Sequence, residues 1–491
     1  MVRTSNITIL ILALLLLFAC RRDEEIIDDA SARLEFSTDS VSFDTVFTSV
    51  GTVTQNIRVY NPYKERIRIS SIRLNGGQGS AFRINVDGSP GPIHTNVEIA
   101  AEDSMFIFIE ATVDPTNVNN PFVITDLIEF ETNGNRQEID LVAWGQNAYY
   151  YTPTSFNRNL PDFTCLTSAC SDAKPPVDTV WTKEKPIVIY GFVAIDSLDR
   201  LTIEAGTEIY FHQGGGIWVY RGGSLRVMGT EAEPVTFQGD RREPAFENRP
   251  GQWDRIWINE GGQNEIHHAR IRNGFIGLQP EVLPFDDPPY DPTSLTITNT
   301  VIENCSGFGM LSSIYNVRAE NLVISNSGQY NMVIRAAGNY DFYHCTLANY
   351  FSEASRETPS VLIQNSFITS NNTQVIGVPE VGMYNSIIYG SLQNEFSTEV
   401  VNNGSLELDF RSVILRTTQA TSDTTQFKQI IRNPPNQLFL DPQNRDFSLS
   451  ENSLARDQGD VNIANVVPID LLGNSRTADG NPDLGAYEFT P

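Results

Sequence analysis

The stretch that decides the fold begins as NTVIEN at 299–304. It returns with variation as NLVISN at 321–326, HCTLAN at 344–349, NSFITS at 365–370 and NSIIYG at 385–390. The starting positions 299, 321, 344, 365 and 385 are separated by 22, 23, 21 and 20 residues. A steady period in this range is typical of a repeat architecture. Each copy alternates polar residues with apolar or β-branched ones, which predicts a strand and not a helix.

A repeat of about 22 residues has room for roughly three short strands and their turns. Stacking such repeats at about 4.8 Å per coil predicts a right-handed parallel β-helix. The leucine-rich repeat has a similar period but needs several fixed leucines, which this stretch lacks. We expect one inward column to contain Val301, Val323, Thr346, Phe367 and Ile387. We also expect the amides of Asn304, Asn326 and Asn349 to form a hydrogen-bonded ladder along the axis.

Length and charge limit the classes of partner. The chain has 491 residues, which suits two to four domains, and 40% of them are hydrophobic. Its formal net charge of -26 argues against nucleic acid and anionic membrane surfaces as partners. That charge is compatible with calcium or with neutral glycans.

The first 20 residues read as a secretory signal, in which Arg3 precedes an apolar run too short to span a bilayer. The sequence LFAC at 17–20 resembles a bacterial lipobox, which implies a lipid anchor on Cys20 as the membrane partner. The alternative is an ordinary cleaved signal peptide. Residues 21–33 then form a polar tether, whose RRDEE start resembles the tag of Gram-negative lipoproteins that reach the cell surface. These resemblances imply an outer-membrane, surface-exposed lipoprotein in an oxidising compartment.

The pattern of strands and turns predicts that residues 34–147 form a separate all-β unit. Its strands are expected at 53–60, 67–74, 105–111, 127–131 and 139–143. Strands at this spacing fit an immunoglobulin-like β-sandwich. The motifs FDTV at 43–46, VYN at 59–61 and LVAWG at 141–145 resemble Hydin-like immunoglobulin-type domains, which implies a spacer or binding module. Residues 148–186 then read as a linker. Its Cys165 and Cys170 are close enough for a small disulfide loop, and a metal site there is less favoured.

The sequence predicts that residues 187–430 form the β-helix. The motifs LTIEAGTEIYF at 201–211, SLRVMGT at 224–230, GQW at 251–253 and IWI at 256–258 resemble the opening coils of bacterial pectin-lyase-like β-helix lipoproteins. The resemblance implies packing roles for Trp253 and Trp257, with sugar stacking as the alternative. Two insertions, at 240–249 and 279–292, are candidate binding loops.

We expect residues 431–491 to form a capping region. The open end of a solenoid exposes apolar columns and unpaired strand edges, and these must be covered. The motif DLGAYEF at 483–489 resembles the ending of bacterial surface β-helix proteins. Five acids of this region are compatible with calcium ligands, although turn capping is favoured: Asp446, Asp457, Asp460, Asp470 and Asp483.

Catalytic residues are harder to find. A lyase needs an Arg or Lys base and a hydrolase needs convergent carboxylates. Glu303 is the one carboxylate at the positions of the repeat motif that we expect to point outward. The motifs of pectin-cleaving hydrolases are absent, so no catalytic or metal-ligating residue is assigned. The remaining ligand candidates are His267, His268 and Arg270, followed by the Asp286 and Asp287 pair in the proline-rich loop. Cys305 and Cys345 are expected to be free, packed thiols.

Three functions remain open. The first is a non-catalytic envelope lipoprotein whose β-helix binds a glycan or another surface component. The second is a polysaccharide lyase or hydrolase of pectin-lyase-like fold. The third is a structural or adhesive rod.

Overall fold

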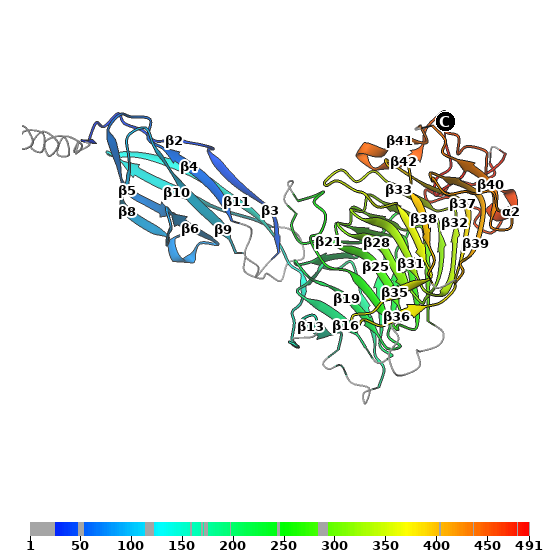
Figure 1. Ribbon diagram of the computed structural model, residues 1–491. Helices are drawn as coiled ribbons and strands as arrows, with labels where there is room; N and C mark the ends of the chain where they lie inside the picture. Colours follow the sequence, from blue (N-terminus) through cyan, green and yellow to red (C-terminus); the bar gives the residue numbers. More distant parts are fainter. Residues whose placement is uncertain are drawn as a thin grey trace, which may run out of the picture. The chain divides into compact units, whose positions relative to one another are not determined.

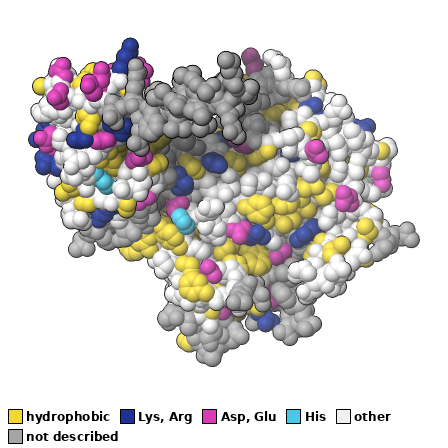
Figure 2. Space-filling view, turned by 60° about the vertical axis from the view of Figure 1, so that its left-hand side comes forward, with side chains coloured by type: hydrophobic (Ala, Val, Ile, Leu, Met, Phe, Trp, Pro, Cys, Tyr) yellow, Lys and Arg dark blue, Asp and Glu magenta, His cyan; other side chains and the backbone are white. Residues whose placement is uncertain are grey.

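The structure is a computed structural model in which the chain forms two compact units, Met1–Asn147 and Ala148–Pro491 (Figure 1). It describes residues 25–47, 54–112, 122–157, 160–167, 170, 175–196, 198–242, 246–282, 293–401, 404–435, 437–478 and 480–490. Cys20, Asp286 and Asp287 lie outside the described residues. On the face drawn in Figure 2, acidic and basic side chains are scattered among hydrophobic ones and do not gather in one block.

The first unit is a β-sandwich of two sheets. The six-stranded sheet contains β1 (Ile26–Ile27), β3 (Ser40–Phe47), β5 (Arg66–Leu74), β8 (Ile93–Ile99), β10 (Phe122–Thr132) and β11 (Asn135–Gln146). The five-stranded sheet contains β2 (Glu35–Phe36), β4 (Gln55–Tyr60), β6 (Phe82–Val86), β7 (Ser89–Pro90) and β9 (Ser104–Ala111), and a short 3-10 turn spans Gly77–Gly79. In β9 the alternate residues Met105, Ile107, Ile109 and Ala111 are buried, as the period of two in a half-covered strand requires. The predicted strands are confirmed.

The tether is shorter than predicted. Ile26 and Ile27 pair in parallel with Arg66 and Ile67, and Ala32 is buried in the sandwich core. Residues 25–33 therefore belong to the first unit, because this short apolar pair completes a sheet edge.

The second unit is a parallel β-helix with three faces. Its 18-stranded sheet turns a corner and supplies two of them, and a nine-stranded sheet supplies the third. We call the faces sheets I, II and III. Every strand pairs in parallel with its counterpart in the next coil, as in Ile302 with Ile324 and Ile324 with Leu347. The predicted all-β fold, with a parallel β-helix after a sandwich, is confirmed, and right-handed winding is the rule for such parallel crossovers.

The strands of sheet I are β14 (Asp178–Trp181), β17 (Arg200–Glu204), β20 (Ser224–Met228), β23 (Gln263–His267), β26 (Ser294–Thr298), β29 (Asn316–Glu320) and β32 (Gly338–Tyr343). Those of sheet II are β12 (Tyr149–Tyr151), β15 (Ile187–Ile189), β18 (Glu208–Phe211), β21 (Val235–Gly239), β24 (Ala269–Arg272), β27 (Val301–Glu303), β30 (Val323–Ser325) and β33 (Thr346–Asn349). Three late strands run through the corner and contribute to both sheets: β37 (Pro379–Gly390), β39 (Glu407–Leu415) and β40 (Phe427–Arg432).

Sheet III contains β13 (Phe163–Cys165), β16 (Phe192–Ile195), β19 (Gly216–Tyr220), β22 (Ile256–Asn259), β25 (Ile276–Glu281), β28 (Phe308–Ser313), β31 (Tyr330–Arg335), β34 (Val361–Gln364) and β38 (Phe396–Glu399). The other elements are the hairpins β35 (Ser366–Ile368) with β36 (Gln374–Ile376) and β41 (Phe439–Asp441) with β42 (Asp446–Leu449), a 3-10 turn at Pro442–Asn444, and α2 (Val461–Ala464).

The corner between sheets I and II explains the residue type at the first position in four of the five copies of the repeat motif. Asn299, Asn321, His344 and Asn385 all have positive φ, between 45° and 52°. Asn tolerates this left-handed conformation because its short polar side chain bonds locally. The amide of Asn321 donates to Asn299 Oδ1 at 2.7 Å, and Asn385 and His344 are joined at 3.2 Å. The strongest polar ladder therefore lies at the start of the repeat. At the other end of the repeat, no bond among the described residues joins the side chains of Asn304, Asn326 and Asn349, so the predicted ladder is wrong: Asn304 donates to Asn273 Oδ1 and Asn349 to the Ser327 carbonyl.

The prediction that the column beginning with Val301 points into the core was wrong. Ile302, Ile324, Leu347 and Ile388 point into the main core, whereas Val301, Val323, Thr346 and Ile387 point out of sheet II. The outward column is nevertheless covered, because the C-terminal segment 438–489 packs over it with Leu438, Phe447, Leu484 and Ala486. Figure 1 shows β41 and β42 beside the late coils. The C-terminal segment thus covers a side of the β-helix.

Two further predictions require correction. Thr346 pairs directly with Ile387, whereas Phe367 lies in β35, which forms an antiparallel hairpin with β36 inserted between coils. The segment 148–186 is also not a linker, because β12, β13 and β14 pair in parallel with β15, β16 and β17. The β-helix therefore begins at Tyr149.

Candidate functional site

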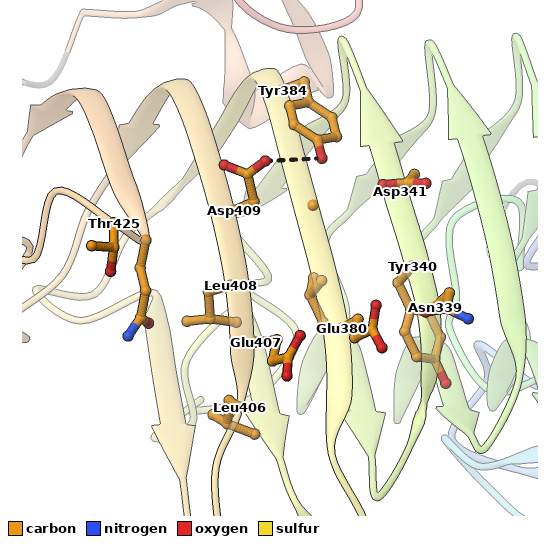
Figure 3. A pocket seen from close by; sticks show the side chains of 13 residues that line it. Asn339, Tyr340, Asp341, Glu380, Tyr384, Leu406, Glu407, Leu408, Asp409 and Thr425 are labelled. Carbon is orange, nitrogen blue, oxygen red and sulfur yellow. Dashed lines mark hydrogen bonds between the residues drawn. The ribbon is translucent and has the colours of Figure 1, made fainter.

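A groove of about 460 Å³ lies on sheet I near the C-terminal end of the β-helix. It crosses β32, β37 and β39, and its acidic side chains stand on the outer face of these three strands (Figure 3). Four of the lining residues are acidic: Asp341, Glu380, Glu407 and Asp409. The others that matter for its chemistry are Asn339, Tyr384, Thr425 and Gln426.

The strand register places these carboxylates. Glu380 pairs with Glu407, so the two stand side by side on neighbouring strands, about 4.8 Å apart at the backbone. Asp341 and Asp409 both pair with Gly382, which puts them about 9.6 Å apart on either side of a glycine. Alternate residues of the same strands, such as Phe342 and Met383, point into the core. The period of two therefore sends every acid of the groove outward.

Gly382 leaves room for an aromatic ring. A side-chain carbon at this position would lie 2.4 Å from Tyr384 Oη, so only glycine lets the tyrosine lie back over the sheet. Tyr384 stacks on Tyr343 with ring centroids 4.8 Å apart, and the Arg318 guanidinium lies 4.6 Å from the Tyr343 ring centroid. Burial, together with the charges of Asp341 and Asp409, raises the pKa of Tyr384. The tyrosine is therefore a neutral hydrogen-bond donor at the edge of the groove.

Asp409 is held in its ionised form. Tyr384 Oη donates to its Oδ2 at 3.4 Å, and Arg411 donates to both of its carboxylate oxygens at 2.8 and 2.6 Å. Lys428 Nζ lies 3.6 Å from Oδ1. Partial burial acts to raise the pKa of Asp409, but these hydrogen bonds and cations outweigh it and hold the pKa below its ordinary value. Asp409 is therefore an acceptor of hydrogen bonds and a poor proton donor.

Glu380 and Glu407 differ from Asp409. Both are exposed, and within the described part of the chain no hydrogen bond or ion pair engages either carboxylate. Their oxygens are available to accept hydrogen bonds from an incoming ligand. Carboxylates beside a tyrosine and an amide suit a ligand that is rich in hydroxyl groups. Their backbone spacing of about 4.8 Å is close to the separation of about 5–5.5 Å between the two carboxyl groups of a retaining glycosidase.

The two tryptophans predicted as ligand candidates lie elsewhere. Trp253 is 1% exposed, donates from Nε1 to the Arg272 carbonyl and belongs to the main core, so it cannot stack on a sugar. Trp257 is half-buried on sheet III, where its ring stacks on Trp218 and its Nε1 donates to Glu281 at 2.7 Å. The structure gives both side chains packing roles.

The histidine candidates occupy the corner before sheet II. His267 Nδ1 lies 2.7 Å from Thr298 Oγ1 on the outer face of sheet I, on β23, three strands before β32, where the groove begins. His268 has a φ of 45°, its Nε2 lies 3.1 Å from Asn299 Nδ2, and burial lowers its pKa. Arg270 is exposed on β24 beside Val301. None of the three lines the groove.

Cysteines and tail acids have structural roles. Cys165 and Cys170 are joined in a disulfide with Cα atoms 5.5 Å apart, and Cys305 and Cys345 are buried free thiols. Tail acids cap turns, as in Asp460 accepting from the Asn462 amide at the start of α2 and Asp470 accepting from the Leu472 amide. Among the described residues, no group of three or more His, Cys, Asp or Glu side chains could hold a metal ion.

The groove residues were missed because only the repeat motif was compared between coils. An alignment of the coils on their left-handed corner residues would have identified the acidic residues of the groove. Asp341 and Asp409 each stand three positions before a corner residue, His344 and Ser412, and Glu380 and Glu407 stand five positions before Asn385 and Ser412. Acids in equivalent positions of successive coils are the signal.

No protein-family model and no curated protein matches this chain. One solved structure with some similarity is a family 123 glycoside hydrolase from Clostridium perfringens, described in terms of glycolipid glycan hydrolysis. The match covers 22% of this chain and 23% of that chain, with 10% sequence identity and a TM-score of 0.16. A match of this size carries no argument about function. Within the described residues, no helix is long and apolar enough to cross a membrane.

Proposed function

We propose that this protein is a non-catalytic glycan-binding protein of the cell envelope and that the groove on sheet I binds a neutral glycan. The observation that carries the proposal is that the exposed carboxylates of Glu380 and Glu407 line one groove together with Tyr384, whose ring stacks on Tyr343. Carboxylates accept hydrogen bonds from sugar hydroxyls, and the edge of an aromatic pair offers apolar surface to a sugar ring.

Charge indicates which glycans fit. Four acids line the groove, and Arg411 and Lys428 are already engaged with one of them, Asp409. A uronate or sulfate would meet unneutralised carboxylates, since like charges at this separation repel. The groove therefore favours a neutral or amino sugar over an acidic one.

Hydrolysis is the second candidate, and the position of Glu380 and Glu407 on neighbouring strands favours it. A glycosidase needs one carboxyl group that keeps its proton as general acid, and this usually requires a raised pKa. Asp409 has the opposite property, and the groove lies on the open face of a sheet. We therefore rank binding above catalysis.

A glycan array tests the proposal, with release of reducing ends measured in parallel on every glycan that binds. We expect binding of neutral glycans without release. The double variant Glu380→Gln, Glu407→Gln should lose binding, whereas the exposed Glu204→Gln on an early coil of sheet I should not. Release that depends on Glu380 and Glu407 would establish the hydrolase, and an array without any binding would contradict glycan binding by the groove.

Lipid attachment is part of the proposal. The LFAC sequence at 17–20 supports anchoring through Cys20, with the chain facing outward from the outer membrane of a Gram-negative bacterium. Metabolic labelling with a fatty acid should mark the chain and not its Cys20→Ser variant. Protease treatment of intact cells then distinguishes the outer face from the periplasm.

A further inference from the structure

The outer face of the five-stranded sheet in the first unit carries two exposed aromatic rings. Phe106 and Phe108 lie on β9, the middle strand of this sheet, and are 37% and 40% exposed. They point away from the sandwich core because the alternate residues Met105 and Ile107 point into it. The two rings stack on each other with their centroids 6.0 Å apart. Adjacent apolar side chains in solvent, unlike single ones, mark an interaction surface.

Charged side chains on the two neighbouring strands frame these rings. The register places Arg58 of β4 on one side of Phe106, and Asp87, which follows β6, on the other side. Arg83 lies on β6, on the same side as Asp87, and at the other end of the patch beyond Phe108. We call the surface formed by these five side chains the β9 face.

Both arginines of the β9 face are oriented by uncharged groups. The Arg58 guanidinium lies 4.5 Å from the Phe106 ring centroid. Arg83 Nη1 donates to the Ser80 and Phe82 carbonyls at 2.5 and 2.8 Å. Among the described residues, no carboxylate forms an ion pair with either guanidinium. Their positive charges are therefore available to the carboxylates of another molecule.

The acidic side chains beside these arginines do not neutralise them. Asp87 is exposed, and no hydrogen bond or ion pair engages its carboxylate in the part of the chain that the structure describes. Glu110 pairs with Arg83 in the strand register, but its carboxylate accepts a hydrogen bond from Thr54 Oγ1 at 2.6 Å. The β9 face therefore carries charges of both signs that are not joined to one another.

The other sheet of the same unit pairs its arginines with acids. Arg66 and Arg68 both bond to Glu98, at 3.3 and 2.7 Å. Arg73 forms an ion pair with Glu129 in the same way. Arginines without an acidic partner, beside exposed aromatic rings, therefore distinguish the five-stranded sheet among the described residues. Aromatic residues and arginine are the side chains enriched at protein–protein interfaces.

We propose that the β9 face joins two copies of this chain in a symmetric dimer. A twofold axis places the same surface of two copies against each other, so that surface must be complementary to itself. With the axis along β9, Asp87 of one copy lies opposite the partner's Arg58. With the axis across β9 at Phe108, Asp87 lies opposite the partner's Arg83. Both arrangements pair opposite charges around aromatic rings, and Phe108 meets its own copy in each.

Disulfide cross-linking of the full chain tests this contact directly. Phe108→Cys places a thiol at the axis, so mild oxidation should join two copies through that position. Ile93→Cys is the control, because Ile93 is 59% exposed on β8 of the other sheet and should not cross-link. The unaltered chain gives the baseline for Cys20, Cys305 and Cys345. Cross-linking of Phe108→Cys that does not exceed that of Ile93→Cys would overturn the proposal.

Light scattering of the full chain over a hundredfold range of concentration measures the dimer without a cross-link. The dimer fraction should rise with concentration. Phe106→Thr should raise the dissociation constant of the dimer at least tenfold, since threonine suits a strand but lacks the ring. Asp87→Asn should raise it about fivefold, and asparagine tolerates the φ of 48° at this position. Glu131→Gln removes an exposed carboxylate from the other sheet and should leave the dimer unchanged.

Other results would assign the β9 face differently. A chain that stays monomeric at every concentration, or a dimer that Phe106→Thr leaves intact, would contradict the pairing of β9 faces. Binding of a monomeric chain to vesicles of phosphatidylethanolamine and phosphatidylglycerol, lost in Phe106→Thr, would assign the face to a lipid surface instead. The inference does not rest on the glycan groove, which lies in the other unit. Glu380→Gln, Glu407→Gln should therefore leave the dimer intact.

Discussion

Asn321→Ala should be among the most destabilising single substitutions on the surface-facing corner of the β-helix. Asn321 is 3% exposed and has a φ of 52°, a conformation that costs Ala about 1 kcal/mol. Its amide donates to Asn299 Oδ1 at 2.7 Å and to the Ile469 carbonyl at 2.9 Å, and these two bonds contribute about 1 kcal/mol each. Its Oδ1 accepts from the buried Arg476 at 2.6 Å, a charged bond worth about 2 kcal/mol. The total is about 5 kcal/mol.

Urea denaturation followed by tryptophan emission measures this effect, since four of the five tryptophans lie in the second unit (Trp144 is the exception). Asn372→Ala is the control. Asn372 has a φ of 60° in an exposed turn, and no side-chain hydrogen bond of it is found in the described structure. Asn372→Ala should lower the free energy of unfolding by about 1 kcal/mol, which is the cost of the left-handed backbone conformation alone. Equal losses in the two variants would refute the role assigned to the ladder and to Arg476.

Three other perturbations test separate parts of the structure. Burial holds the pKa of His344 well below its ordinary value in the folded protein. As pH falls, this imidazole therefore takes up a proton in the unfolded chain before it does so in the folded one. As pH falls below about 6.5, the free energy of unfolding should drop by up to about 1.4 kcal/mol per pH unit relative to His344→Asn, and a constant difference between pH 7.5 and 5 would contradict this. Leu484→Ala should cost about 2–5 kcal/mol and open residues 438–489 to protease, whereas the exposed Leu472→Ala should not. Tyr384→Ala should weaken glycan binding about tenfold without changing the melting temperature by more than a few degrees, and unchanged affinity in a glycan titration would exclude the tyrosine from the site.

The sequence was sufficient for the coil architecture but not for the direction of its side chains. The repeat motif holds two adjacent apolar residues, as in Val301 and Ile302, and both are protected because one side faces the core and the other faces the C-terminal segment. A strand buried on both faces lacks the alternation that identifies the inward side. The choice of Val301 as the inward residue therefore had no physical basis in the motif.

Long-range contacts explain the other errors. The NSFITS copy at 365–370 has the composition of a coil strand, yet it folds back on β36 in a hairpin, because composition does not show which partner a strand will find. The strands β12, β13 and β14 are three or four residues long and precede the first regular repeat. Their pairing with the next coil comes from tertiary structure, and no local pattern distinguishes them from a linker.

Part of the candidate site could have been predicted from the sequence. Glu380, Glu407 and Asp409 keep a fixed offset from the left-handed corner residues, so the corner register would have aligned them.

The most direct measurement of the central claim is a crystal structure of the chain with the neutral oligosaccharide that binds it most tightly. The account predicts sugar rings across β32, β37 and β39, with hydroxyls bonded to Glu380 and Glu407 and one ring against Tyr384. A sugar bound anywhere else, for example at Trp257 on sheet III, would contradict the assignment of the groove.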